Sequence, residues 1–219
     1  MSLSSALNGF GSGGSIHQHG LMSEIDPMDQ GQGAQPWSID RVGVVGMGLI
    51  GGSIALDLSQ QGVEVQGLVH REVTAERARS RGLAPLVSTD PSCLQNCDLV
   101  ILALPLESLL SPQESLIKAI PERAVVTDVG SVKAEVLAVW RDLHPRFVGI
   151  HPMAGTAQAG VDAGLPGLFC GRPWVSTPES STDASALAVI QQLADRLGSH
   201  WLTADAARHD QAVALISHL

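Results

Sequence analysis

Residues 42–53 constrain the fold of this chain more than any other stretch, because a valine-rich run leads directly into three closely spaced glycines. The run carries no charge and is typical of a strand that is buried on both faces of a parallel sheet. Gly46, Gly48 and Gly51 form G-x-G-x-x-G, whose glycines allow a tight turn, close approach of a pyrophosphate and close packing of the next helix, respectively. Helical spacing over residues 53–58 supplies that helix, and its N-terminal N–H groups attract phosphate. We therefore predict a dinucleotide site here, and the alternative is a glycine-rich turn without a ligand.

The rest of the chain alternates strands and helices from Ser38 onward. This alternation predicts an α/β fold, namely a Rossmann-type doubly wound, mostly parallel sheet with helices on both faces. The expected strands cover residues 42–45, 63–69, 83–87, 99–104, 124–127, 147–150, 174–176 and 200–203. The expected helices follow the glycine loop up to Gly62 and cover residues 74–81, 112–120, 132–141, 183–197 and 205–219, with a short one after Asp90. A loop as long as residues 153–172 inside a compact domain usually carries function.

The charge and cysteine content exclude several classes of protein. The net charge of −9 argues against nucleic acid or an anionic membrane as the main partner. No apolar run approaches the roughly 18–20 residues of a membrane-spanning helix. Cys93, Cys97 and Cys170 show no metal-ligand spacing beyond C-x3-C, so we expect no metal site. Their odd number favours reduced thiols in a cytoplasmic protein.

Residues 1–38 are rich in Gly, Ser and Gln and contain no lysine or arginine. A signal peptide needs a basic start followed by an apolar core, and neither is present. His17 and His19 could bind a metal weakly, but two histidines in a polar tail are usually solvated. We therefore expect a disordered tail without a function.

The end of the second expected strand indicates which dinucleotide binds. An NAD site places a carboxylate there, about twenty residues after the glycine loop, to hold the ribose 2′-hydroxyl. Here Val69 is followed by His70 and Arg71, and Glu72 stands just beyond. Because an arginine at this position pairs with a 2′-phosphate, we predict NADP rather than NAD. The alternative is a solvated Arg71 and a site that does not distinguish the two cofactors.

Three strand ends should meet near the cofactor, because ligands of doubly wound sheets bind beyond the carboxyl ends of the strands. They are Leu104–Pro105, residues 128–131 and residues 150–152. His151 is the only histidine at such a position, so we predict that it is the general base for an alcohol that is oxidised. Ser131 could hydrogen-bond the imidazole or the substrate hydroxyl. The alternatives are a capping or core histidine and a serine that only caps the following helix.

Five motifs add a resemblance to a known family. They are GMGLIGGS at residues 46–53, TDVGSVK at 127–133, GIHPMAGT at 149–156, HDQAVA at 209–214 and ISHL at 216–219. Residues 41–219 thereby resemble the prephenate/arogenate dehydrogenases of tyrosine biosynthesis. Within that family they look most like the cyanobacterial-type arogenate dehydrogenases, which use NADP. The HPMAG and ISHL signatures are far more specific than the glycine loop.

The resemblance implies oxidative decarboxylation of arogenate to tyrosine, or of prephenate to 4-hydroxyphenylpyruvate, with hydride transfer to NADP+. It also implies that His151 accepts the ring-hydroxyl proton and that Ser131 orients both His151 and the substrate. We expect cofactor contacts from Gly46, Gly48, Leu49, Ile50, Gly51, His70, Arg71, Leu104, Pro105 and Ser131. Substrate contacts are implied for Gly155, Thr156, His209 and His218, whereas Ala157 stands where the family often has an acidic residue.

The family continues beyond its last motif into a helical domain that dimerises and completes the substrate pocket, whereas this chain stops at Leu219. We therefore expect a tail at residues 1–38, an NADP-binding Rossmann domain at 39–204 and the first helix of a truncated helical domain at 205–219. The full-length enzyme should be a homodimer that acts on a small molecule, and the fragment should bind the cofactor but turn over little. Two other interpretations stay open: an NADP-dependent oxidoreductase of hydroxy or imino acids, and a non-catalytic NADP-binding module.

Overall fold

The structure is a computed structural model, and it describes residues 37–216 of the chain. Within these residues, six parallel strands form one sheet in the order β3-β2-β1-β4-β5-β6. The strands are β1 (Arg41–Val45), β2 (Glu64–Leu68), β3 (Leu86–Ser88), β4 (Leu99–Leu102), β5 (Val125–Asp128) and β6 (Phe147–Val148). This order is that of the doubly wound Rossmann fold, so the predicted fold class is confirmed. The tail expected at residues 1–38 lies outside the described residues except for its last two positions.

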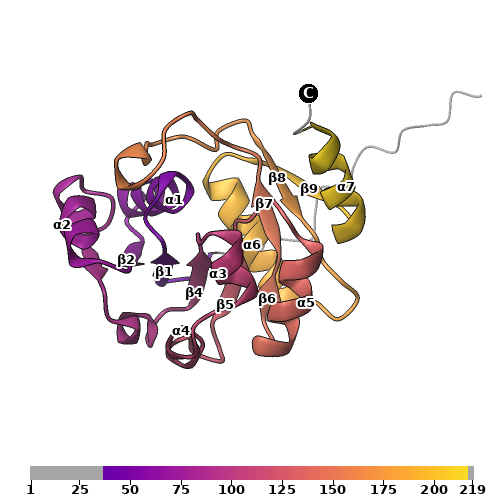
Figure 1. Cartoon of the computed structure of the whole chain (residues 1–219), viewed down its shortest axis with the longest axis horizontal. Coiled ribbons are helices and arrows are strands. Elements are labelled where there is room, and N and C mark those ends of the chain that lie inside the picture. Colours follow the sequence, from indigo (N-terminus) through magenta and orange to yellow (C-terminus); the bar gives the residue numbers. More distant parts are fainter. Residues whose placement is uncertain (1–36, 217–219) are drawn as a thin grey trace, which may run out of the picture. The chain divides into compact units, whose positions relative to one another are not determined.

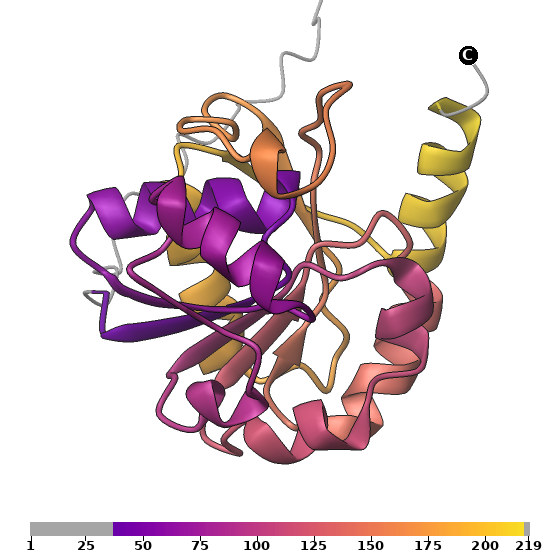
Figure 2. The same cartoon turned by 60° about the vertical axis from the view of Figure 1, so that its left-hand side comes forward.

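Helices cover both faces of this sheet (Figures 1 and 2). They are α1 (Leu49–Gln60), α2 (Glu72–Ser80), α3 (Leu106–Leu110), α4 (Glu114–Ala119), α5 (Ala134–Leu143) and α6 (Ala184–Arg196), with 3-10 turns η1 (Pro91–Leu94) and η2 (Val161–Ala163). Leu99 and Ile101 of β4 pack in the core formed with α1 and α6, whereas Val100 and Leu102 pack in the core formed with α3, α4 and α5. Because successive side chains point to opposite faces, a strand covered on both sides needs the uninterrupted apolar sequence found here.

A second sheet of three strands adjoins the first. Its strands are β7 (Ile150–Pro152), β8 (Pro173–Ser176) and β9 (His200–Thr203), with β7 antiparallel to β8 and β8 parallel to β9. The single strand predicted at residues 147–150 is therefore wrong, because the chain changes sheets at Gly149. The carbonyl oxygen of Gly149 accepts a hydrogen bond from the N–H of Thr177 at 3.0 Å. A Cβ atom on Gly149 would lie only 3.1 Å from the Oγ1 atom of Thr177, so this crossing point favours glycine.

Two helices also differ from the prediction. The helix predicted at residues 112–120 is α4, but the short helix α3 before it was not predicted, and the backbone of Ser111, with φ −134° and ψ 68°, ends α3. The first helix begins at Leu49, so Gly51 and Gly52 belong to its first turn. The other predicted elements agree with the structure apart from small shifts of their ends.

The last helix, α7 (Ala206–Ile216), lies beside α5 (Figures 1 and 2). It confirms the helix predicted at residues 205–219 as far as the chain is described, and Leu215 on it is 72% exposed. Residues 217–219, which include His218, lie outside the described residues. Over residues 37–216, no helix has the length and apolar character needed to cross a membrane.

Candidate active site

The glycine loop between β1 and α1 has the geometry predicted for it. Gly46 has a φ of +93°, and a Cβ atom there would lie 2.2 Å from the carbonyl oxygen of Ala103. A Cβ atom on Gly51 would lie 2.0 Å from the carbonyl oxygen of Gly46. By contrast, a Cβ atom on Gly48 would meet no atom within 4 Å. The first and third glycines therefore close the turn, while the second leaves open space of the kind that a pyrophosphate needs.

This open space belongs to a cavity of about 950 Å³ along the carboxyl ends of β1, β2 and β4. The predicted cofactor residues that line it are Gly46, Gly48, His70, Arg71, Leu104 and Pro105. It is also lined by polar side chains that the sequence analysis did not name, among them Thr74, Thr89, Ser108, Ser111 and Gln113. Of the remaining predicted contacts, Leu49, Ile50, Gly51 and Ser131 do not line this cavity in the described part of the chain. Its size is that of a typical cofactor site.

The end of the cavity at β2 favours an anion. Arg71 is exposed and occupies the N-cap position of α2. The neighbouring carboxylate, Glu72, is bound by Arg79 at 2.5 Å, so it is drawn toward that side chain. The exposed guanidinium of Arg71 and the N-terminus of α2 thus lie together at the rim of the cavity, and both attract anions.

The long loop predicted at residues 153–172 is fastened to the helices beside the cavity. Asp57, which is buried on α1, accepts a hydrogen bond from the N–H of Gly167 at 2.9 Å. Arg81, just after α2, donates to the carbonyl oxygen of Val161 at 2.7 Å. Since Val161 lines the cavity, the loop forms one of its walls.

His151 lies in β7, and its half-buried imidazole contacts a second histidine. The Nδ1 atom of His151 is 3.0 Å from the Nε2 atom of His209 on α7, and the two rings meet edge to face at 84°. His209 is 5% exposed, and its Nδ1 atom lies 2.8 Å from the Oδ1 atom of Asp210. Burial, with His209 and Lys133 close by, lowers the pKa of His151 to about 4. The ring is therefore neutral at pH 7, which is the form that accepts a proton.

Asp210 also caps helix α5. Its Oδ1 atom accepts from the N–H of Lys133 at 2.8 Å, and its Oδ2 atom accepts from the N–H of Ala134 at 2.9 Å. Ser131, the alternative cap, does not occupy this position, and the helix begins two residues later than predicted. The N-cap position is that of Lys133, whose own side chain does not cap. A carboxylate from another helix takes that role, since it satisfies two free N–H groups and favours the helix dipole.

A fully buried ion pair lies behind His151. The ammonium of Lys133 contacts the carboxylate of Asp128, and neither side chain has exposed surface. Lys133 also donates to the carbonyl oxygen of Ile150 at 2.6 Å, and Asp128 accepts from the N–H of Gly130 at 2.9 Å. Burial lowers the pKa of Lys133 and raises the pKa of Asp128, and their mutual attraction opposes both changes. The pair ties the end of β5 to the residue that precedes His151.

The cavity and the histidine pair lie on the two sides of the carboxyl end of β5. The cavity extends to the residues that follow β4, and His151 is not part of its lining. Leu102 of β4 pairs with Asp128 of β5, and Asp128 accepts a hydrogen bond from the N–H of Ile150 at 3.4 Å. The carboxyl end of β5 therefore lies between β4, whose end lines the cavity, and β7, which carries the imidazole.

The structure does not gather every predicted site residue around the His151 imidazole. Ser131 is exposed, and in the described part of the chain no hydrogen bond joins it to that ring, so its orienting role stays a prediction. Gly155 and Thr156 are exposed in the long loop, and their substrate contacts also stay predictions. The prediction for His218 falls outside the described residues.

Asp128, Lys133 and Asp210 were not predicted as site residues, although all three lie inside the motifs TDVGSVK and HDQAVA. A carboxylate directly after a buried strand, followed five residues later by a lysine among apolar residues, could have indicated the buried pair. Asp210 gives no such signal, because the N–H groups it binds lie 76 and 77 residues away.

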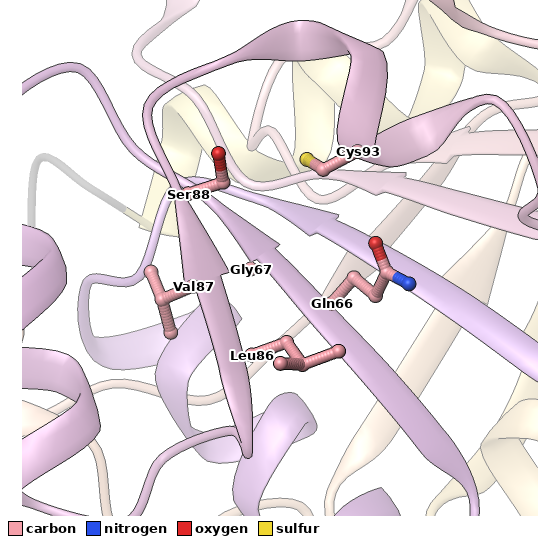
Figure 3. Close-up of a pocket in the computed structure, with 6 residues that line it drawn as sticks. All are labelled: Gln66, Gly67, Leu86, Val87, Ser88 and Cys93. Carbon is pink, nitrogen blue, oxygen red and sulfur yellow. The ribbon is translucent and has the colours of Figure 1, made fainter.

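A second, smaller cavity of about 210 Å³ lies between β2, β3 and η1 (Figure 3). Its lining consists of Gln66, Gly67, Leu86, Val87, Ser88 and Cys93. None of these side chains is charged, and burial raises the pKa of the Cys93 thiol, which makes it a poor nucleophile. This cavity is therefore not a candidate for catalysis.

Together these features define a class of protein. A parallel sheet in this strand order, a glycine loop that is open above its second glycine and a cavity along the strand ends form a dinucleotide-binding domain of the kind that dehydrogenases carry. Residues 54–203 match the family model described as prephenate dehydrogenase, nucleotide-binding domain. The chain belongs to the prephenate dehydrogenase family, and the resemblance drawn from the five motifs is confirmed.

Individual relatives agree with this family. The chain is 31% identical over 183 residues to the cyclohexadienyl dehydrogenase of Zymomonas mobilis, across 81% of this chain and 62% of that protein. Its fold matches the crystal structure of Synechocystis arogenate dehydrogenase with a TM-score of 0.77 and 39% identity, across 81% of this chain and 64% of that one. For the prephenate dehydrogenase of Aquifex aeolicus in complex with hydroxyphenyl propionate and NAD+, the TM-score is 0.78 and the identity 28%, across 84% and 66% of the two chains. The chain thus spans less than two thirds of the length of each of these relatives.

Proposed function

We propose that the full-length protein is an NADP-dependent dehydrogenase that converts arogenate to tyrosine, or prephenate to 4-hydroxyphenylpyruvate, by oxidative decarboxylation. The observation that carries this proposal is the neutral, half-buried His151 imidazole, which β5 alone separates from the strand that lines the dinucleotide cavity. Family membership and the 39% identity to Synechocystis arogenate dehydrogenase support the substrate class.

In this mechanism His151 is the general base. Its neutral ring accepts the proton of the ring hydroxyl while hydride leaves the carbon that bears that hydroxyl. NADP+, held by the glycine loop and by Arg71, supplies the hydride acceptor when bound. Carbon dioxide is then lost because the ring becomes aromatic, so no residue of the chain has to stabilise a carbanion. The proton on the imidazole passes to solvent and restores the base.

The preference for NADP rests on Arg71. It lines the cavity at the end of β2, where an NAD site would place a carboxylate. Because Arg79 binds Glu72, that carboxylate does not compete for the Arg71 guanidinium. His70 lines the same part of the cavity and adds a hydrogen-bonding ring.

The roles of the other predicted site residues are also proposals. Ser131, Gly155, Thr156 and His218 would contact the substrate or orient the base. We also propose a cytoplasmic enzyme that works as a homodimer, in which further helical chain covers the side of α7 where Leu215 is 72% exposed.

The direct test offers arogenate and prephenate separately to the full-length protein and follows formation of the reduced cofactor by its absorbance. We expect turnover with NADP+ and one or both substrates, and its loss in His151→Gln. The matched control is His200→Gln, which changes an exposed histidine on β9 and should leave turnover intact. Intact NADP binding without turnover of either substrate would contradict the proposed function.

A further inference from the structure

Three side chains stand in a row behind the reacting face of the site: Asp210, His209 and His151. We propose that His209 and Asp210 are positioning residues that hold the ring proton of His151 on Nδ1 and thereby leave Nε2 as the proton acceptor. This inference rests on the proposed function, because it concerns the base of that reaction.

The row begins with a carboxylate whose charge is held in place. Partial burial disfavours the charged form of Asp210, but the N–H of Ala134, the His209 ring and the N–H of Lys133 outweigh it and keep its pKa below the usual value. An ionised carboxylate only accepts hydrogen bonds. The Nδ1 atom of His209, 2.8 Å from Asp210, must therefore carry a hydrogen, since two lone pairs would otherwise face each other.

A neutral imidazole carries one ring hydrogen, on either Nδ1 or Nε2. A neutral His209 with its hydrogen on Nδ1 presents a lone pair at Nε2. The Nδ1 atom of His151, 3.0 Å away, can form a hydrogen bond to that lone pair only by donating its own hydrogen. The Nε2 atom of His151 is then the unprotonated nitrogen, ready to receive the hydroxyl proton of the substrate.

The other charged groups near His151 do not replace this contact. His209 and Asp210 approach from α7, and Lys133 approaches from the start of α5. Lys133 donates to Asp128 and to the carbonyl oxygen of Ile150, so its ammonium faces away from the ring pair. Its positive charge disfavours the imidazolium form of His151 but cannot select one ring nitrogen over the other.

Asp210 also positions α7, the helix that carries His209. The carboxylate binds the first N–H groups of α5, so it fastens α7 beside the strand end that carries His151. Asp210 thus holds α7 in place and also fixes the tautomer of His209, which α7 carries.

The experiment records two-bond proton–nitrogen correlations of the histidine rings in the ¹⁵N-labelled 219-residue chain, which separate protonated from unprotonated ring nitrogens without any turnover. His151→Gln and His209→Gln assign the two rings among the eight histidines. We expect a hydrogen on Nδ1 and a lone pair on Nε2 for both rings near neutral pH. His209→Ala should mix the two tautomers of His151, whereas His209→Gln, whose amide oxygen can still accept, should preserve the Nδ1 hydrogen in part.

In the full-length enzyme, His209→Ala and Asp210→Asn should lower kcat by about 10- to 100-fold and change KM by less than about threefold. His200→Gln should leave both the spectrum and kcat unchanged. A hydrogen on Nε2 of His151 in the unaltered chain, or a charged His209, would overturn the inference, and so would a His151 tautomer that survives His209→Ala. These results are independent of the proposed function, which fails instead if His151→Gln leaves turnover intact.

Discussion

The Nε2 atom of His209 lies 3.0 Å from the Nδ1 atom of His151, although 58 residues separate the two histidines along the chain. The resemblance implied that His209 contacts the substrate. That contact stays a prediction; in the structure His209 lies between the imidazole of His151 and the carboxylate of Asp210, with 5% of its surface exposed. His209 therefore contacts the Nδ1 side of His151, the predicted base, and only the Nε2 atom of His151 can face a ligand.

The three glycines of the loop should respond differently to alanine. Because a Cβ atom on Gly48 meets no protein atom within 4 Å, Gly48→Ala should change the free energy of unfolding by less than about 1 kcal/mol. It should nevertheless weaken NADPH binding by about tenfold or more, since the methyl group occupies the space of the pyrophosphate. Fluorescence titration with NADPH and urea unfolding measure the two effects.

Gly51→Ala is the matched control for that variant. Its Cβ atom would lie 2.0 Å from the carbonyl oxygen of Gly46, so the cost should appear in stability, at about 1–3 kcal/mol or more. Unchanged NADPH affinity in Gly48→Ala would mean that the pyrophosphate does not lie over this loop.

Arg71→Gln should separate the two cofactors. Removing the guanidinium deletes charge-assisted hydrogen bonds worth about 1.5–3 kcal/mol, so affinity for NADP should fall by about 10- to 100-fold. Affinity for NAD, which has no 2′-phosphate, should change by less than about threefold. Calorimetric titration with both cofactors checks this, and Arg123→Gln, an arginine just before β5 and absent from the cavity lining, is the control. Equal losses for NAD and NADP would argue against a 2′-phosphate site.

Acid should destabilise the fold through His151. Its pKa falls from 6.5 to about 4 on folding, so the unfolded chain binds more protons between these two pH values. The contribution of the neutral ring is therefore complete above about pH 6.5 and is lost as the pH falls toward about 4. Urea unfolding of the parent and of His151→Gln across this range should show the difference in unfolding free energy shrinking on acidification. A difference that does not vary with pH would contradict the buried neutral ring.

The buried pair behind His151 should behave as a unit. Lys133→Met leaves the Asp128 carboxylate without its partner and should lower the free energy of unfolding by about 3–5 kcal/mol. The double variant Lys133→Met/Asp128→Asn should cost less than the sum of the two single variants, because neither charge is then stranded. Lys118→Met, which breaks the exposed pair with Glu114, should have little effect. Additive costs at Lys133 and Asp128 would show that the two side chains act separately.

Features that depend on local periodicity could be predicted from the sequence. The valine-rich strand, the glycine turn and the helix after it follow from residues close together in the chain, and so does the alternation that gives the sheet. His151 could be placed near the carboxyl ends of the parallel strands because it follows the end of β6 by three residues, although it belongs to β7 of the second sheet. The change of sheet at Gly149 could not, because nothing in residues 147–152 shows which partner strand each residue will find.

The contacts that His209 makes with His151 and Asp210 could not be predicted, for a related reason. His209 reaches His151, and Asp210 reaches the start of α5, only after α7 has packed beside that helix. A sequence pattern reports which side chains are polar, but not which N–H group 76 residues away will need a partner. The nearby Ser131 was therefore the alternative considered for the cap, while the structure uses the distant Asp210.

The crossing at Gly149 gives the site a mechanical property. The glycine loop belongs to the six-stranded framework, whereas His151 belongs to the three-stranded one and pairs with Val175 of β8. Nucleotide and base are thus carried by two different sheets, and the Lys133–Asp128 pair holds these sheets together through its hydrogen bonds to Ile150. Loosening this buried pair would alter the alignment for proton and hydride transfer while leaving the glycine loop intact. Variation in the buried contacts that join the two sheets is accordingly a route by which turnover can be tuned independently of cofactor affinity.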